Sequence, residues 1–303
     1  MVDFPNQVVL CDVTLRDGLQ REKEFVPTAT KLALYDVLLD AGVLHFEIGA
    51  FVSPRVIPQM LDTPEVIAGA KKPPGVLFQA LVPNLKGALR AVETNVDELI
   101  YLCTASDTYT RKNQNSTLER VMSQLGDVVK VAHERNVKVR LGIGMSFGCP
   151  YEGPTPPEKV LRLVDEAFEA GVDSVQPADS IGVATPGHIQ RLLRSIYDRW
   201  PKADVGLHLH DNRGLALANT LAGIDAGCRH FDAALAGLGG TPIYAASMGN
   251  ACIEDMAYML EGANVKTGLD LEKLVAAARM AEEIVGHPGH SHLLAAGIKP
   301  VAA

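Results

Sequence analysis

Short aliphatic runs alternate with longer amphipathic segments along most of this sequence. The runs are rich in valine, isoleucine and leucine, as is typical of parallel strands buried on both faces. Eight runs are present, at residues 7–13, 43–49, 75–82, 97–105, 137–145, 172–179, 204–211 and 228–237. A segment with helical character follows each run, so the chain consists of eight strand–helix units without a linker between them.

Eight such units favour an α/β fold of the closed (β/α)8 type, a TIM barrel, over an open doubly wound sheet. No G-x-G-x-x-G motif follows the first strand, which argues against a dinucleotide-binding fold. A TIM barrel commonly takes about 250 residues, so a chain of 303 residues fits one domain. We therefore expect a single catalytic domain over residues 1–285, with an extra C-terminal helix at about 270–285 and a tail at 286–303.

Charge and apolar patterning exclude several classes of protein. The net charge is −8 and no basic run is present, so we expect no nucleic-acid partner. No apolar stretch approaches the roughly 20 residues that a membrane-spanning helix needs, and the first residues lack the features of a secretory signal. The five cysteines are scattered without a C-x-x-C pair, which favours reduced thiols. We expect a cytoplasmic protein that binds small molecules.

Polar side chains gather at the carboxyl ends of the predicted strands, where TIM-barrel enzymes carry their active sites. They are Arg16, Asp17 and Gln20 after the first strand, Glu47 in the second, Asp179 at the end of the sixth, His208 and His210 at the end of the seventh, and Asn250 after the eighth. These residues lie far apart in the sequence, but the fold would bring them to one mouth.

The sequence VGLHLHDN at 205–212 places two histidines two residues apart in a predicted strand. Side chains at this spacing point to the same face, so His208 and His210 can both point into the barrel. For the pair alone, a core histidine beside a solvated one is an equally good interpretation. Asp17 and Asn250 at matching barrel positions add two oxygen ligands and favour a divalent-metal site. An open octahedral site suits Mg²⁺ or Mn²⁺, although the ligand types also admit Zn²⁺ or Fe²⁺.

Several long motifs resemble a known family. The motifs are TLRDGLQREKEFVPT (14–28), FEIGAFVSPRVIPQM (46–60), GCPYEG (148–153), DSIGVATPG (179–187), HLHDNRGLALANT (208–220) and AGLGGTP with the following GN (236–250). They are similar to those of the 3-hydroxy-3-methylglutaryl-CoA (HMG-CoA) lyase family and, more broadly, of the metal-dependent TIM-barrel lyases and aldolases. The resemblance runs from about Val8 to Val285.

The resemblance implies roles for individual residues. The family's metal ligands match Asp17, His208, His210 and Asn250, its catalytic arginine matches Arg16, its site acids match Glu47 and Asp179, and its first-loop glutamine matches Gln20. Asp12 stands where these lyases usually have a glutamate. Asp179 and Asp12 are the candidate bases. Alternatively, they hold the metal ligands or Arg16 in place through hydrogen bonds. Arg16 would stabilise an enolate oxygen.

Two further positions depart from the family pattern. The family carries a catalytic cysteine in the glycine-rich loop after strand eight, and Thr241 occupies that place here. A threonine hydroxyl is a far weaker acid than a thiol, so a metal-bound water, a histidine or Thr241 with a bound water would have to protonate the enolate. Arg213 replaces an uncharged aromatic residue, and it is either a surface residue or a binder of a substrate carboxylate.

The segment TYTRKNQNST at 108–117 is basic and polar and is expected to be a loop, followed by one long helix at about 117–135. Arg111 and Lys112 in this loop could meet the phosphates of a coenzyme A ester, although most Lys–Arg pairs are only part of a solvated surface.

These observations favour a divalent-metal-dependent carbon–carbon lyase. By the resemblance, it would cleave a 3-hydroxyacyl-CoA such as HMG-CoA to acetyl-CoA and a keto acid, here acetoacetate. One alternative is an aldolase for a hydroxy-oxo acid without coenzyme A, which Arg213 and the missing cysteine favour. Another is a non-catalytic barrel that binds an acyl-CoA, which only Thr241 favours. Barrels of this kind are commonly dimers, so a homodimer is a further hypothesis.

Overall fold

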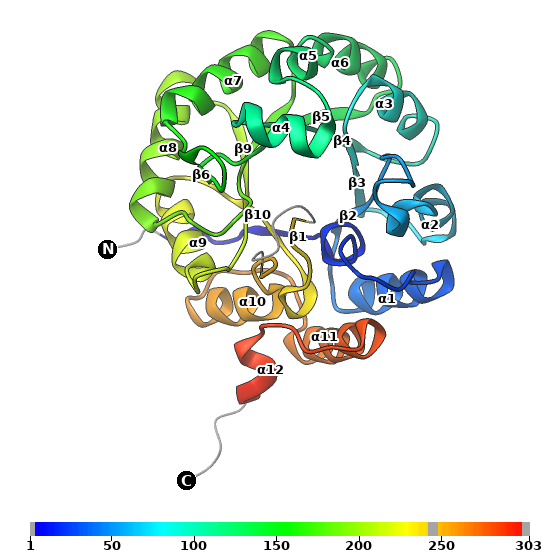
Figure 1. Ribbon diagram of the computed structural model, residues 1–303. Coiled ribbons are helices and arrows are strands. Elements are labelled where there is room, and N and C mark those ends of the chain that lie inside the picture. Colours follow the sequence, from blue (N-terminus) through cyan, green and yellow to red (C-terminus); the bar gives the residue numbers. More distant parts are fainter. Residues whose placement is uncertain (1–3, 242–247, 299–303) are drawn as a thin grey trace.

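Eight parallel strands close into a barrel in the computed structural model, which describes residues 4–241 and 248–298 (Figure 1). The barrel strands are β1 (Val9–Asp12), β2 (His45–Ala50), β3 (Leu77–Val82), β4 (Glu98–Thr104), β5 (Lys138–Gly144), β8 (Ser174–Asp179), β9 (Asp204–Leu209) and β10 (His230–Ala233). Strand β1 pairs with β2 on one side and with β10 on the other, which closes the ring. The predicted TIM barrel is confirmed.

Helices surround this ring, and most of them bury apolar side chains against the strands (Figure 1). They are α1 (Thr28–Asp40), α2 (Thr63–Gly69), α3 (Leu85–Ala91), α4 (Asp107–Gln114), α5 (Leu118–Met122), α6 (Leu125–His133), α7 (Pro157–Glu169), α8 (Pro186–Arg199), α9 (Ala216–Asp225), α10 (Ile253–Gly262), α11 (Leu271–Val285) and α12 (His292–Ala296). In α7, a proline begins the helix and Gly171, at φ +89°, follows its end. Within the described ranges, no helix is both long and apolar enough to cross a membrane.

A layer of polar side chains fills the amino-terminal part of the barrel interior. The buried Glu98 carboxylate accepts hydrogen bonds from Gln79 Nε2 at 2.5 Å and from Ser174 Oγ at 3.1 Å. The Arg140 guanidinium lies 3.3 Å from the same carboxylate. Most of these polar atoms have partners in the layer, although Arg140 Nε has none among the described residues, so the barrel can be polar inside and still be closed below the mouth.

The structure corrects the predicted long helix at 117–135. Helix α5 ends at Met122 and α6 begins at Leu125. At the break, the Gln124 side chain accepts a hydrogen bond from Leu85 N at 3.2 Å and donates one to Arg120 O. This tertiary contact favours the break, and the hydrophobic period of the sequence carries no trace of it.

The prediction of a loop at 108–117 is also wrong, because most of this segment forms helix α4. The Ser106 hydroxyl caps this helix by accepting a hydrogen bond from Tyr109 N at 3.1 Å. Figure 1 shows α4 on the inner side of the helix ring. Only Tyr109 and Thr110 of this helix are buried, so it lacks the apolar stripe by which an outer helix is recognised.

Part of the predicted tail packs against the barrel. Asp255 on α10 accepts hydrogen bonds from Ser291 Oγ at 2.8 Å, His292 N at 2.8 Å and Leu293 N at 2.9 Å. His290 N donates to Ala236 O after β10. Residues 289–293 are therefore tied to the carboxyl end of the barrel, whereas 299–303 lie outside the described residues.

Candidate active site

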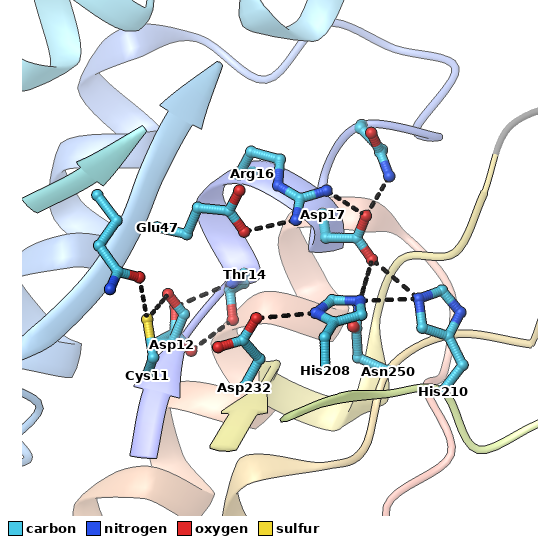
Figure 2. A network of polar contacts seen from close by, with 12 residues as sticks. Cys11, Asp12, Thr14, Arg16, Asp17, Glu47, His208, His210, Asp232 and Asn250 are labelled. Carbon is cyan, nitrogen blue, oxygen red and sulfur yellow. Dashed lines mark hydrogen bonds and ion pairs between the residues drawn. The ribbon is translucent and has the colours of Figure 1, made fainter. Parts of the chain in front are cut away.

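The turn after β1 carries Arg16 and Asp17 into the barrel mouth (Figure 2). It is a single π-helical turn over Thr14–Gly18. Asp12 begins the turn: its carboxylate accepts hydrogen bonds from Thr14 N at 3.0 Å and Thr14 Oγ1 at 2.7 Å. Thr14 Oγ1 in turn accepts one from Leu235 N at 2.8 Å, which links this turn to the loop after β10.

Asp17, His208 and His210 each contribute one possible ligand atom, and the three atoms lie within 4.8 Å of one another. The two Nε2 atoms lie 3.1 Å apart, and Asp17 Oδ2 lies 3.5 Å from His210 Nε2 and 3.9 Å from His208 Nε2. All three side chains are buried. Although burial opposes ionisation, Arg16 and the two histidines hold the pKa of Asp17 well below its usual range, so the carboxylate is anionic.

The residues present fit a divalent cation. Adjacent ligands in an octahedral shell of radius about 2.1 Å lie about 3 Å apart, which is close to the spacing of the two imidazole nitrogens. His208 Nδ1 lies 2.9 Å from Asp232 Oδ2, an arrangement that fixes the ring and leaves Nε2 for a metal. Asn250 Oδ1 is buried and has no hydrogen-bond donor among the described residues, so it can also act as a ligand.

Two glycines let the loop after β10 approach the metal ligands closely. A Cβ at Gly239, where φ is +109°, would lie 2.5 Å from Asp17 O and 2.6 Å from Asn250 Nδ2. A Cβ at Gly249, where φ is +119°, would lie 2.0 Å from Gly237 O. Asn250 Nδ2 can then donate to Asp17 Oδ2 at 2.7 Å and to Leu238 O at 2.8 Å. The glycine-rich motif is therefore required for packing.

Arg16 is held by two carboxylates. Its Nη1 donates to Asp17 Oδ1 at 2.6 Å and its Nη2 to Glu47 Oε2 at 2.5 Å (Figure 2). Arg16 Nε is buried without an acceptor among the described residues. Gln20 Nε2 donates to the same Asp17 oxygen as Arg16 and also to Gly240 O at 3.3 Å. The guanidinium is thus fixed beside the metal ligands, and its Nε–H has no acceptor among the described residues.

A cavity of about 780 Å³ lies at the barrel mouth. Its polar end is formed by Arg16, Asp17, His208 and His210, and Gln20 and Thr241 also line it. The Thr241 hydroxyl, on the loop after β10, hydrogen-bonds to the Tyr109 hydroxyl on α4. Burial raises the pKa of Tyr109, so its hydroxyl is protonated at neutral pH.

Both predicted bases are engaged elsewhere. The Asp179 carboxylate accepts hydrogen bonds from Val183 N at 2.9 Å and Ala184 N at 2.8 Å, in the loop before α8. Asp12 is engaged by Thr14, and burial raises its pKa to about 7. Neither residue lines the cavity, in contrast to Arg16 and Asp17.

Three predicted substrate-binding residues also lie away from the cavity. Arg213 Nη1 donates to Ile181 O at 3.0 Å and Gly182 O at 2.8 Å, so it joins two neighbouring loops. Arg111 and Lys112 are exposed on α4, and Lys112 Nζ lies 4.9 Å from the centre of the Tyr151 ring. None of the three lines the cavity.

Two site residues were missed in the sequence. Asp232 contacts His208 Nδ1, and it is buried in β10 between Phe231 and Ala233. A single carboxylate within a predicted buried strand could have pointed to Asp232. No sequence pattern points to Tyr109, because only the folded chain brings it to Thr241.

A closed parallel barrel with a histidine pair, a carboxylate and an arginine at its carboxyl mouth defines a metal-dependent TIM-barrel enzyme. The chain belongs to the HMGL-like family, whose model matches residues 7–281. It is a carbon–carbon lyase, and this family is divalent-metal dependent. The resemblance seen in the sequence motifs is confirmed at the level of the family.

The similarity extends over almost the whole chain. It is 39% identical to human mitochondrial hydroxymethylglutaryl-CoA lyase, over 91% of this chain and 85% of that protein. It is 38% identical to a hydroxymethylglutaryl-CoA lyase of Bacillus subtilis, over 94% of this chain and 95% of the relative. A solved HMG-CoA lyase of Acinetobacter baumannii, in complex with coenzyme A and 3-methylmalate, superposes with a TM-score of 0.94 at 35% identity, covering 100% of this chain and 99% of that one.

Proposed function

We propose that this enzyme cleaves a 3-hydroxyacyl-CoA of the HMG-CoA type to acetyl-CoA and a keto acid, which is acetoacetate for HMG-CoA itself. The observation that carries the proposal is the Asp17–His208–His210 cluster beside Arg16 at the polar end of the 780 Å³ cavity. The similarity to lyases of this specificity, over nine-tenths of the chain, supports the substrate class.

Asp17, His208, His210 and Asn250 would hold Mg²⁺ or Mn²⁺. A divalent cation bound there supplies Lewis-acid polarisation of the substrate's alcohol oxygen. Asp232 keeps the His208 ring in place through its contact with Nδ1. Gln20 and Arg16 share one oxygen of Asp17, which leaves the other oxygen directed toward the two histidines.

Arg16 would stabilise the negative charge that develops when the C–C bond breaks. Its guanidinium is permanently protonated and fixed by Asp17 and Glu47, so it does not reorganise during the reaction. The buried Nε–H, which has no acceptor among the described residues, is available to the enolate oxygen. Glu47 acts by positioning Arg16.

Asp12 and Asp179 would position the turn after β1 and the loop before α8, because their oxygens are engaged by Thr14 and by backbone N–H groups. Asp17 and the histidine pair line the cavity, but as metal ligands they would not also take up the alcohol proton. We further propose that Thr241 stands at the position of the family's cysteine, and that the Thr241–Tyr109 hydroxyl pair delivers a proton to the enolate.

The aldolase alternative loses support, because Arg213 bonds to the carbonyl groups of Ile181 and Gly182 and does not reach the cavity. The test of the proposal is acetoacetate formation from HMG-CoA by purified enzyme with Mg²⁺ or Mn²⁺, beside a chelator control. A chelator-sensitive rate of about 1 s⁻¹ or more is expected for an enzymatic reaction. Absence of product from every 3-hydroxyacyl-CoA tested, with metal bound, would refute the proposed function.

A further inference from the structure

The two ends of the cavity have opposite chemical character. Its polar end holds Arg16, Asp17, His208 and His210. Its other end, formed by β3, β4 and the segment after β2, is lined by Leu81, Ile100, Leu102, Val52 and Ile57. We call these five residues the apolar wall. Ligand cavities commonly combine apolar walls with a few convergent polar groups, and each part contacts the portion of the ligand that matches it.

The apolar wall is separate from the core between strands and helices. Leu81 packs with Ala50 and Met60 in a small cluster of its own, and the half-buried Val52, Ile57 and Leu102 lie against it. Within a barrel mouth, partly exposed aliphatic side chains form concave apolar surface, which is typical of a ligand contact.

Strand β5 leaves space in front of this wall. Leu102 pairs with Gly142 and Thr104 with Gly144 in the β4–β5 register, and both glycines line the cavity. A Cβ at Gly142 would lie 3.1 Å from Ile100 Cγ2 and 3.8 Å from Leu102 Cδ1. A side chain at this position would therefore occupy the space that the apolar wall borders.

The apolar wall has a limited extent. Beyond it, Asn84, Lys86 and Arg120 line the cavity, and all three are exposed. A group that lies along the wall thus reaches a polar rim, which suits a short aliphatic chain of several carbons and not a long lipid chain. A methyl group, as in HMG-CoA, would cover little of this surface.

We propose that the enzyme acts on 3-hydroxy-3-alkylglutaryl-CoA thioesters whose 3-alkyl group is longer than methyl and packs against the apolar wall. This inference rests on the proposed function. In the reaction the hydroxyl loses its proton, the C2–C3 bond breaks and C3 becomes a ketone. The electron pair of the broken bond forms the enolate of acetyl-CoA, which takes up one proton. The products are acetyl-CoA and a 3-oxo acid that carries the longer chain.

The test compares HMG-CoA with the 3-butyl, 3-hexyl and 3-dodecyl homologues, using metal-loaded enzyme. Each methylene that leaves water contributes about fourfold to binding, so kcat/KM should rise at least tenfold from methyl to butyl or hexyl. It should fall again at dodecyl, where the chain passes the polar rim. A methyl substrate that is used as well as or better than the longer homologues would overturn the inference and leave the lyase function intact. If no thioester of the series is cleaved, the proposed function and this inference both fail.

A second measurement separates an alkyl site from a site for the pantetheine arm of coenzyme A. Gly142→Val fills the space before the apolar wall and should lower the hexyl-to-methyl ratio of kcat/KM at least tenfold. An equal loss for all homologues would assign the wall to the part of the thioester that they share, against the inference. Gly126→Ala is the control, because Gly126 is exposed on α6 with no neighbouring atom within 4 Å of its Cβ position. If Gly142→Val does not fold, Leu102→Asn makes the wall polar and should lower the same ratio.

Discussion

The Tyr109 hydroxyl, on α4, is hydrogen-bonded to the Thr241 hydroxyl on the loop after β10. Both side chains are buried and line the cavity that holds Arg16 and Asp17. The two residues are 132 positions apart in the sequence, and the barrel alone brings them together. We have proposed that this pair of hydroxyl groups takes the place of the cysteine that the family resemblance implies.

Tyr109→Phe should lower kcat by about 10²-fold or more, because a positioned proton donor contributes 10²- to 10⁴-fold. The ring and its packing are retained, so metal content should not change. The solvent isotope effect on kcat should increase if protonation of the enolate becomes rate-limiting. Tyr258→Phe, on the exposed part of α10, is the matched control. An unchanged kcat in Tyr109→Phe would show that this hydroxyl transfers no proton.

Thr241→Cys tests the second hydroxyl of the pair. A thiol is a stronger acid than a hydroxyl, so the variant should cleave HMG-CoA at least as fast as the natural enzyme. Thr241→Val, which keeps the shape but has no hydroxyl, should be slowed to the level of Tyr109→Phe. Steady-state rates of the three enzymes at saturating metal provide the measurement. Full activity in Thr241→Val would exclude the hydroxyl pair as donor.

His210→Ala should abolish stoichiometric binding of Mg²⁺ or Mn²⁺, because it removes one of three converging ligand atoms. Asp232→Asn should weaken binding by about 10- to 100-fold, since Asp232 acts on the metal only through the ring of His208. Calorimetric titration with each metal gives both affinities. Retained stoichiometric metal in His210→Ala would refute the ligand assignment. His188→Ala is a suitable control, because His188 lies at the start of α8, away from the site.

Glu254 should make the stability of the fold depend on pH. Burial raises its pKa from about 4.5 to about 8, so the folded state favours the protonated carboxyl. The resulting stability is fully present below pH 4.5 and is lost as the pH rises through 8, by an amount on the order of a few kcal/mol. Glu254→Gln keeps an acceptor for Ala236 N and does not ionise, so it should reduce the loss of stability between pH 5 and 9. Urea unfolding at the two pH values measures this, with the exposed Glu283→Gln as control. Equal pH dependence in all three proteins would contradict the prediction.

Regular features of the chain were readable from the sequence. The eight aliphatic runs predicted the barrel strands because parallel strands are buried on both faces. The two-residue spacing of His208 and His210 placed both rings on one face, and the structure brings them to Asp17. What the sequence could not show are contacts made through space. The break at Gln124 depends on Leu85, and the engagement of Asp179 depends on the backbone of the next loop. Arg213 resembled a substrate ligand but bonds to loop carbonyls.

The polar layer of Gln79, Glu98, Arg140 and Ser174 has a consequence for traffic through the enzyme. It closes the amino-terminal end of the barrel, so the substrate enters and both products leave through the same opening at the mouth. The product that lies deeper can leave only after the other has dissociated. Product release would then be ordered, and an excess of the product that leaves first would slow the release of the second.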